Sequence, residues 1–454
     1  MSPSRKPRFL LVNPWIHDFA AFNLWLRPYG FLQLHAFLRE QGIACEYIDL
    51  LHVGPEEIER WYLPAPEDKG HGQGRFRAEV TPKPEAYQFI ERRYRRFGIP
   101  ANVLYDKLEE REPPAAVLLT SGMTYWYRGV QETIEVIREV WPDTPVILGG
   151  IYATLCEAHA REHSGADQVI SGPWEGTLLP VLDRDYGLTL SKSTALATLP
   201  FASNDLYDGS RVAVTRFTQG CPFRCAYCAA HRLQPQFEAR PPARIIEEIA
   251  WNLDGGRNEI ALYDDALLFR ADEHLVPVLE HAVKQDWSCS FHTPNGLHAR
   301  YMTPRIAELF HASGFATVRL SFESIHGVAQ ADSDGKVEPA DLEKALQYLF
   351  EAGYPKGDID VYMLIGQPEQ TDGEVRETAE FIHAAGGRMR PAEYSPVPGT
   401  TAFERDLAAD PRLADEPLLH NPTVAPGWGF VENRLNRLKQ FIRGLNQQLP
   451  GRTE

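Results

Sequence analysis

The stretch TQGCPFRCAYCAAHRL, residues 218–233, places three of the six cysteines of the chain within eight residues: Cys221, Cys225 and Cys228. Thiolates spaced Cys-x-x-x-Cys-x-x-Cys on one tight loop can bind three irons of a cubane cluster and leave the fourth iron without a protein ligand. Two other interpretations stay open from these residues alone. His231 could complete a tetrahedral zinc site as the fourth ligand, or the three thiols could be free.

The composition predicts a soluble, cytoplasmic protein with no membrane or nucleic-acid partner. Hydrophobic residues make up 43% of the 454 residues and charged residues 24%, which are ordinary proportions for a globular protein of two or three domains. No run of eighteen apolar residues occurs, and the N-terminal MSPSRKPRFLLVNPW has too short an apolar stretch for a secretory signal. A net charge of -16 argues against a broad phosphate-binding surface.

The remaining cysteines, Cys45, Cys156 and Cys289, are isolated in apolar or mixed surroundings. A disulfide framework would need cysteines in spread pairs and an oxidising compartment. We therefore interpret these three residues as buried thiols.

Strands and helices alternate through residues 1–205. Short apolar strands are expected at 9–12, 45–50, 117–119 and 146–148, with helices after Tyr29 and over 128–140. This alternation predicts an α/β fold with a parallel sheet covered by helices, a Rossmann-like doubly wound domain that a linker at about 186–205 follows.

Ligands of such domains bind beyond the carboxyl ends of the strands, which singles out the turns at 120–126, 149–153 and 171–175. Glycine there allows close approach of a ligand, although glycine after a strand is also a routine turn residue. The candidate contacts in these turns are Ser121, Gly122, Tyr125, Trp126, Gly149, Gly150, Tyr152, Gly172 and Glu175.

An insertion at about 51–114 interrupts this pattern and is rich in proline, glycine and charge. Long loops in compact domains are usually functional or disordered, so the insertion is either a cap over a ligand site or a surface excursion. Its arginines, Arg92, Arg93, Arg95 and Arg96, could meet an anion, but a solvated helix face is the favoured interpretation.

Six strand-and-helix units between about 206 and 400 predict an open, partial (β/α)6 barrel, whose active residues belong at the carboxyl ends of the strands. The tail, 401–454, is expected to be a short, mainly helical extension. Its apolar face should pack across the open side of the barrel and consists of Leu435, Leu438, Phe441, Ile442 and Leu445.

The cysteine motif, with Tyr227 just before the third cysteine, strongly resembles that of radical S-adenosylmethionine enzymes. The resemblance implies a 4Fe-4S cluster whose open iron is chelated by the methionine amino and carboxylate groups of S-adenosylmethionine. It also implies an electron donor such as flavodoxin or ferredoxin, whose electron leads to cleavage of a carbon–sulfur bond.

The same resemblance implies contacts with S-adenosylmethionine at later strand ends. Asp264 or Asp265 would meet the methionine amino group, although Asp265 could instead cap a helix. Glu323 and Ser324 would lie near the ribose and methionine, or cap a helix that begins near Val328. Gly366 and Gln367 would support the adenine.

The first domain resembles the cobalamin-binding domain of cobalamin-dependent radical S-adenosylmethionine enzymes, in the fragments PYGFLQLHAFLREQGIACEYIDL, VILGGIYAT and VISGPWEGTLLPVL. The Asp-x-His-x-x-Gly motif that supplies a histidine to cobalt is absent, and His17-Asp18 has the wrong order. Members of this family commonly lack the motif and place residues of the turn at 120–126 under the corrin. Cobalamin is thus an implied cofactor.

Together these resemblances imply a cobalamin-dependent methyltransferase that acts on an unidentified small molecule or natural-product intermediate, with catalytic residues unknown. Two alternatives remain. The enzyme could catalyse cyclisation or rearrangement without net methyl transfer, or its first domain could be a substrate-binding module that no longer binds cobalamin. A methylthiolating tRNA enzyme is disfavoured, because that family has three further cysteines in its first domain and a small RNA-binding domain at its end.

Overall fold

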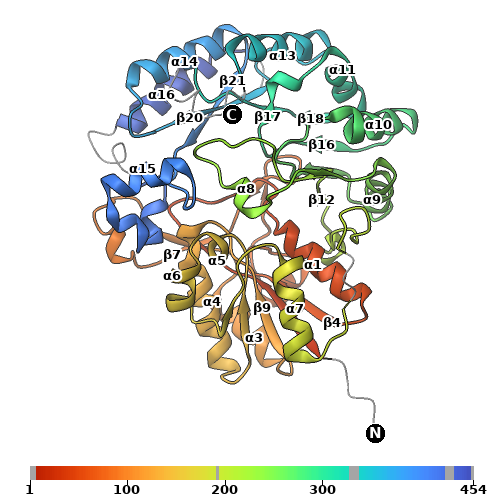
Figure 1. Cartoon of the computed structure of the whole chain (residues 1–454), viewed down its shortest axis with the longest axis vertical. Helices are drawn as coiled ribbons and strands as arrows, with labels where there is room; N and C mark the ends of the chain where they lie inside the picture. Colours follow the sequence, from red (N-terminus) through yellow and green to blue (C-terminus); the bar gives the residue numbers. More distant parts are fainter. Residues whose placement is uncertain (1–6, 191–193, 327–336, 425–433, 451–454) are drawn as a thin grey trace. The chain divides into compact units, whose positions relative to one another are not determined.

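The computed structural model describes residues 7–190, 194–326, 337–424 and 434–450, shown in Figure 1. The chain forms two compact units. Unit 1 comprises Met1–Arg211 and Asp415–Leu419, and unit 2 comprises Val212–Ala414 and His420–Glu454. Within the described ranges, no helix has the length and apolar character needed to cross a membrane.

Unit 1 is built on a five-stranded parallel sheet, as the alternating pattern predicts. The strand order is β11-β10-β9-β1-β4, and the strands are β1 (Arg8–Asn13), β4 (Ala44–Asp49), β9 (Ala116–Leu119), β10 (Val146–Leu148) and β11 (Gln168–Val169). In chain order this is 2-1-3-4-5, the flavodoxin-like variant of the doubly wound fold. Its order reverses between β1 and β9, so the ligand crevice of unit 1 is expected beyond these two strands.

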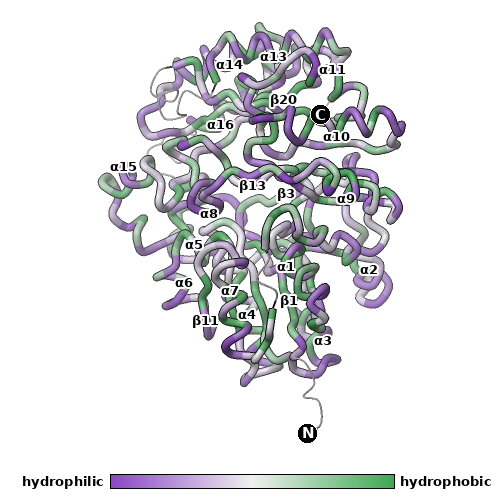
Figure 2. Tube along the Cα trace, turned by 45° about the vertical axis from the view of Figure 1, so that its right-hand side comes forward, coloured by the Kyte–Doolittle hydropathy of each residue, from purple (hydrophilic) through white to green (hydrophobic). Residues whose placement is uncertain are grey.

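Helices cover both faces of this sheet. Helices α1 (Tyr29–Glu40) and α7 (Trp174–Tyr186) pack their apolar residues against Phe9 and Leu11 of β1. Leu10 and Val12 alternate with these residues and are also buried. Helices α3 (Ala101–Glu109) and α4 (Tyr127–Val140) pack against each other, and right-handed crossovers are expected to place them over this second face of the sheet. The apolar strands at the centre and the mixed helices around them are visible in Figure 2.

The insertion is ordered and contains a helix, α2 (Pro55–Trp61), and short strands. Strand β8 (Arg95–Phe97) pairs antiparallel with β2 (Ile16–Asp18) and with β7 (Ala78–Val80). A second small sheet contains β3 (Phe22–Asn23), β5 (Glu67–Asp68) and β6 (Gly74–Arg75). The helix-face interpretation of the arginines is therefore wrong for Arg95 and Arg96, which lie on a strand.

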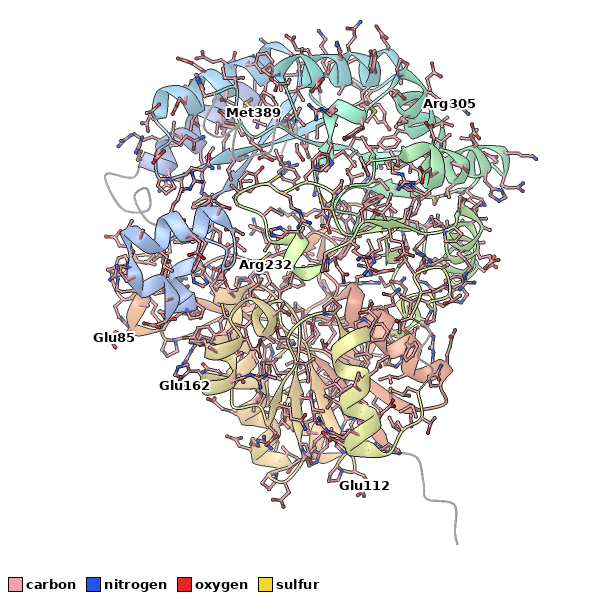
Figure 3. The ribbon with its side chains drawn as sticks, viewed as in Figure 1. Glu85, Glu112, Glu162, Arg232, Arg305 and Met389 are labelled. Carbon is pink, nitrogen blue, oxygen red and sulfur yellow. The ribbon has the colours of Figure 1, made fainter. Side chains whose placement is uncertain are left out.

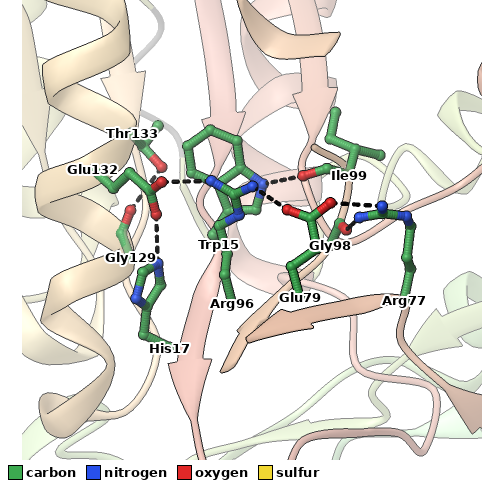
Figure 4. Close-up of polar contacts among 10 residues, drawn as sticks. All are labelled: Trp15, His17, Arg77, Glu79, Arg96, Gly98, Ile99, Gly129, Glu132 and Thr133. Carbon is green, nitrogen blue, oxygen red and sulfur yellow. Dashed lines mark hydrogen bonds and ion pairs between the residues drawn. The ribbon is translucent and has the colours of Figure 1, made fainter. Parts of the chain in front are cut away.

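Arg96 is the centre of a polar network that fastens this small sheet to α4 (Figure 4). Its side chain is only 11% exposed and pairs with Glu132 of α4 at 2.5 Å and with Glu79 of β7. His17 of β2 contacts the other oxygen of the Glu132 carboxylate at 2.5 Å. Although burial opposes ionisation, the hydrogen bonds and charges of His17 and Arg96 lower the pKa of Glu132. The network joins four elements, β2, β7, β8 and α4.

Unit 2 is the expected partial (β/α)6 barrel. One parallel sheet has the order β12-β15-β16-β18 and the other β17-β19-β20-β21. β18 and β19 flank Val318 and form the two halves of the fourth barrel strand. The strands are β12 (Val212–Thr215), β15 (Glu259–Leu262), β16 (Ser290–His292), β17 (Leu297–His298), β18 (Phe315–Thr317), β19 (Arg319–Ser321), β20 (Asp360–Ile365) and β21 (Arg388–Glu393).

Helices follow the strands of the barrel and surround them. They are α9 (Pro242–Asp254), α10 (Ala271–Lys284), α11 (Pro304–Ser313), α13 (Pro339–Glu351) and α14 (Asp372–Ala384). The buried residues of these helices and strands form one apolar core. This arrangement leaves the carboxyl ends of the strands free to hold functional side chains.

The tail forms α15 (Thr401–Ala409) and α16 (Arg434–Asn446), and α16 packs against α14 and β21. Leu438 and Ile442 are buried, and Leu435, Phe441 and Leu445 pack partly buried against the same core. The Asn446 side chain donates to the carbonyl of Met389 and accepts from its amide, both at 2.9 Å. Met389 is labelled in Figure 3. The helical tail is thus fastened to the last barrel strand.

Candidate functional site

The three clustered cysteines lie on the loop between β13 (Thr218–Gln219) and α8 (Ala230–Leu233). Cys225 is buried, Cys221 and Cys228 are half-buried, and all three thiols are free of disulfides. The amide of Ala230 donates to the sulfur of Cys228 at 3.5 Å. Hydrogen bonds of this kind stabilise thiolate ligands and tune the potential of an iron–sulfur cluster.

The positions of these side chains bear on the zinc alternative. Four ligands about 2.3 Å from a tetrahedral zinc lie about 3.8 Å from one another. Cys221, Cys225, Cys228 and His231, all of them described residues, do not bring three or more ligand atoms within 4.8 Å of one another. Sulfurs that bind separate irons of a cubane must lie farther apart, because the iron–sulfide core stands between them. In the part of the chain that the structure describes, these four side chains therefore lack the close spacing of a tetrahedral zinc site.

Tyr227 brings the cysteine loop to the last strands of the barrel. Its ring packs against Leu364, Tyr394 and Ala402. Burial, and next the neighbouring Glu323 carboxylate, raise the pKa of Tyr227 well above the ordinary value for tyrosine. The structure therefore places two of the predicted cofactor contacts, Tyr227 and Glu323, beside each other.

The two neighbouring aspartates after β15 have different environments. Asp264 is 4% exposed, and its carboxylate accepts from the amides of Phe217 and Thr218 at 2.9 and 2.6 Å and from the Thr218 hydroxyl at 2.7 Å. Burial raises the pKa of Asp264 to about 6. This carboxylate is directed at residues 217 and 218, directly before the cysteine loop, rather than at an open ligand site.

Asp265 is exposed at the same strand end. The expectation that it caps a helix is wrong, because the next helix, α10, begins only at Ala271 and has Arg270 at its N-cap. Of the two aspartates, Asp265 is the one whose side chain is accessible to a ligand.

A cavity of about 200 Å³ lies at the carboxyl ends of β19, β20 and β21, where α15 closes it. The predicted contacts Ser324 and Gln367 line it, and so do Gln370, Tyr394 and Asp406. The Ser324 hydroxyl accepts from the amide of His326 at 3.1 Å. The alternative role of Glu323 and Ser324 as caps of a helix near Val328 lies outside the described residues.

Sequence reasoning missed three polar side chains of this cavity, those of Gln370, Tyr394 and Asp406. The Gln370 side chain accepts from the amide of Gly366 at 2.9 Å and donates to the carbonyl of Leu364 at 3.0 Å, and so holds the turn after β20. The Tyr394 hydroxyl donates to Asp406 at 2.5 Å, and burial raises the pKa of Asp406. Gln370 lies only four residues after the predicted contact Gly366, and this short spacing is the sequence signal that could have identified Gln370.

In unit 1, the three turns at the carboxyl edge of the sheet are tied to one another. The Ser121 hydroxyl donates to the carbonyl of Gly149 at 2.6 Å, which joins the turns after β9 and β10. The Thr154 hydroxyl donates to the carbonyl of Gly150 at 2.8 Å and accepts from the amide of Gly172 at 3.1 Å, which joins the turns after β10 and β11. Thr154 is a further residue that sequence reasoning missed.

The glycines of these turns fall into two classes. A Cβ at Gly149 would meet only the Ile170 carbonyl oxygen at 3.9 Å, and one at Gly172 would meet only Thr177 at 3.5 Å. The backbone at these two positions is therefore open to a large ligand. In contrast, a Cβ at Gly150 would lie 2.5 Å from the backbone of Ser121, and one at Gly122 would lie 2.8 Å from the ring of Trp126. These two glycines serve internal packing.

Tyr152 is a predicted ligand contact, but its side chain lies in the core of unit 1. Its side chain is 0% exposed, contacts His159 through its hydroxyl at 2.7 Å and stacks on Tyr127. Helix α5 (Ile151–Leu155) turns the ring inward, away from the carboxyl edge of the sheet.

The other candidates of unit 1 are half-buried. Trp126 donates its indole N–H to Asp18 at 2.7 Å, and Tyr125 lies edge-on to Trp126. Glu175 lies in the first turn of α7. Met123, in the turn after β9, has a side chain that is 45% exposed. Tyr125 and Trp126 follow β9, one of the two strands between which the strand order reverses.

Comparisons with known proteins agree with this geometry. The family model of the radical SAM superfamily matches residues 215–382. The chain resembles two structures of the radical S-adenosylmethionine methyltransferase TsrM from Kitasatospora setae. The first of these structures has tryptophan substrate and an S-adenosylmethionine analogue bound. Its match with this chain has a TM-score of 0.65 and 16% sequence identity, and covers 89% of this chain and 76% of the TsrM chain. For the structure with cobalamin and a [4Fe-4S] cluster bound, the TM-score is 0.64, with 78% of that chain covered.

Curated relatives match this chain over only part of their length. An anaerobic magnesium-protoporphyrin IX monomethyl ester cyclase of Rubrivivax gelatinosus is 21% identical over 60% of this chain and 55% of its own length. A ribosomal protein uS12 methylthiotransferase RimO of Thiobacillus denitrificans is 23% identical over 67% of this chain and 71% of its own. The chain thus spans about half the length of the cyclase.

The cysteine loop yields a test that separates a cluster from zinc. We expect Cys225→Ala to lose the S = 1/2 electron paramagnetic resonance signal of the reduced protein, because one iron loses its thiolate. His231→Ala should keep the signal and the iron content of the parent protein after anaerobic reconstitution. Loss of the bound metal in His231→Ala, with zinc in the parent protein, would contradict the cluster.

The two classes of glycine yield a second test. Gly150 has φ +94°, and a side chain there would be strained and would collide with Ser121. We expect Gly150→Ala to lower the free energy of unfolding by about 2 kcal/mol in urea denaturation. Gly149→Ala is the matched control and should change it by less than about 0.5 kcal/mol, because the added methyl group enters open space. Equal effects of the two variants would refute this division.

Proposed function

We propose that this chain, which belongs to the radical SAM superfamily, is a cobalamin-dependent methyltransferase that acts on a small molecule. One observation carries the cobalamin part of the proposal. The carboxyl edge of the sheet in unit 1 is a set of turns joined by Ser121 and Thr154, with open backbone at Gly149 and Gly172. Such an edge fits a large flat ligand. The likeness of fold to TsrM supports the same proposal.

When bound, the cluster and S-adenosylmethionine supply a deoxyadenosyl radical, and cobalamin supplies a methyl group that can be transferred. The residues of the chain bind and orient these groups. Cys221, Cys225 and Cys228 would hold three irons and leave one iron to the methionine amino and carboxylate groups. Asp265 would pair with the ammonium of the methionine portion, since it is the accessible carboxylate after β15.

The cavity at the ends of β19, β20 and β21 would take the nucleoside portion of S-adenosylmethionine. Its volume of about 200 Å³ suits a nucleoside, and it lies beside Tyr394, which packs against the same apolar residues as Tyr227. Ser324 and Gln367 offer hydrogen-bonding groups from two strand ends. Gln370 fixes the turn that carries Gln367 and so orients this contact.

The substrate would be a small molecule rather than a nucleic acid, because the net charge of -16 disfavours a polyanion. A low-potential electron carrier such as flavodoxin or ferredoxin would reduce the cluster. The chain's part in the reaction is alignment and exclusion of water, because a radical reacts with the nearest available bond.

The similarity to the magnesium-protoporphyrin ester cyclase supports one alternative, ring closure or rearrangement without net methyl transfer. A methylthiotransferase role is disfavoured despite the similarity to RimO. Within unit 1 the cysteines are Cys45 and Cys156, both free thiols, and burial raises the pKa of each to about 12. Two cysteines are fewer than the three that the methylthiolating family has in its first domain.

The decisive experiment is anaerobic reconstitution with iron, sulfide and cobalamin, followed by incubation of small-molecule extracts with S-adenosylmethionine that carries a trideuterated methyl group. We expect a corrinoid to remain bound through gel filtration and mass spectrometry to find a product heavier by one labelled methyl group. Gly149→Ala should retain less corrinoid while folding normally. Absence of corrinoid binding would refute the methyltransferase, whereas bound corrinoid with a changed but unlabelled product would favour the cyclase.

The role of Asp265 yields a further prediction. Asp265→Asn removes the charge that pairs with the ammonium group, so we expect the Kd for S-adenosylmethionine to rise about tenfold, which corresponds to about 1.4 kcal/mol. Isothermal titration of the reconstituted protein measures this change. The iron content should stay at the level of the parent protein, and an unchanged Kd would show that Asp265 is not the partner of the ammonium group.

A further inference from the structure

The residues directly before the cysteine loop are held from two sides by buried charged groups. Residues 216–218 lead from the end of β12 toward Cys221. On one side the Asp264 carboxylate accepts the amides of Phe217 and Thr218 and the Thr218 hydroxyl. This carboxylate belongs to β15's end, 46 residues farther along the chain. All of these contacts lie inside unit 2.

Arg240 holds the other side of the same segment. Its backbone amide donates to the carbonyl of Phe217 at 2.8 Å, and its guanidinium donates to the carbonyl of Arg216 at 2.7 Å. The guanidinium also pairs with Glu248 of α9 at 2.5 Å. The side chains of Arg240 and Glu248 are 3% and 0% exposed. Two peptide groups are thus fixed at their carbonyls by Arg240 and at their amides by Asp264.

The constraint continues along the chain to the first cysteine. Thr218 and Gln219 pair antiparallel with Ala239 and Glu238, directly before Arg240. At Gly220, which has φ +73°, a Cβ would lie 2.2 Å from the carbonyl oxygen of Gln236. The chain is therefore fixed at every residue from 216 to 220, up to Cys221.

Buried charges are a weak source of stability, because desolvation offsets most of their attraction. They do specify one geometry, since a displaced partner would leave a charge buried and unpaired. Asp264, Arg240 and Glu248 are not needed to fill the apolar core. The hydrogen bonds of Asp264 and Arg240 instead converge on one short segment beside the predicted cluster ligands, and Glu248 pairs with Arg240.

We infer that Asp264 and Arg240 are positioning residues that hold residues 216–218 in a fixed path, so that the three cysteine sulfurs are arranged for the cluster before it is assembled. We call this pair and the segment it holds the strand-exit clamp. The inference rests on the radical SAM part of the proposed function alone. It is independent of cobalamin and of the substrate, so its failure is distinguishable from failure of the methyltransferase proposal.

The test compares Asp264→Asn with Asp265→Asn in the reconstituted full chain. An amide at 264 cannot accept all three donors, so we expect a chelator to remove iron about tenfold faster than from the parent protein, without S-adenosylmethionine present. The reduced cluster should also give a broadened paramagnetic resonance signal. Asp265→Asn should lose iron at the parent rate and show only the weaker binding of S-adenosylmethionine. Asp272→Asn, an exposed aspartate in the first turn of α10, is the surface control.

A milder pair of variants keeps the test valid if Asp264→Asn fails to fold. Thr218 is 1% exposed, and its hydroxyl donates to Asp264. Thr218→Val removes only this donor and should speed iron loss about threefold, whereas Thr218→Ser retains the hydroxyl and should match the parent protein. The inference is overturned if Thr218→Val and Asp264→Asn lose iron at the parent rate, or if Asp264→Asn changes only the affinity for S-adenosylmethionine.

Discussion

A loop that gives three thiolates to a four-iron core must keep its sulfurs apart and its backbone in one path. The loop at 221–228 meets this constraint through contacts with the first, second and last parts of the barrel. Asp264 after β15 and Arg240 before α9 hold the segment that enters the loop. At the other end, the amide of Ala402 in α15 donates to the carbonyl of Ala226 at 2.8 Å. The site depends on the whole barrel, because residues as far apart in the sequence as Arg240 and Ala402 fix one loop.

In unit 1, neutral hydroxyl groups rather than charged groups hold the turns at the carboxyl edge of the sheet. To bind the proposed ligand, these turns would have to expose backbone and still keep a fixed shape, and glycine alone would leave them loose. Two hydroxyl groups, those of Ser121 and Thr154, join the three turns through carbonyl and amide groups. The division of the glycines follows from these bonds. Gly150 must approach Ser121 closely, whereas Gly149 and Gly172 remain open.

The sequence predicts the elements of both units because their signals are local. Apolar runs closed by glycine or proline mark β1, β10 and β20, and the three cysteines identify the loop without any knowledge of the fold. The insertion at about 51–114 has no comparable local signal for its strands. The stretch around Arg96 has no apolar period, and only its pairing with β2 and β7 shows that it is a strand. The inward ring of Tyr152 likewise depends on the start of a five-residue helix, a boundary that periodicity does not fix.

Asp264 and Asp265 show most clearly where sequence reasoning ends. They have the same chemistry and adjacent positions, and both follow a strand whose carboxyl end faces the functional edge of the barrel. Successive residues after a strand point in different directions, so the Asp264 carboxylate turns toward the segment before the cysteine loop and Asp265 is exposed to solvent. Polar residues at the strand ends of this barrel therefore have two different roles. Some are accessible to a ligand, as Asp265 is, and others hold the segment that leads to the cysteine loop, as Asp264 does. Hydrogen-bond partners distinguish the roles, and those partners come from residues 46 and 47 positions away.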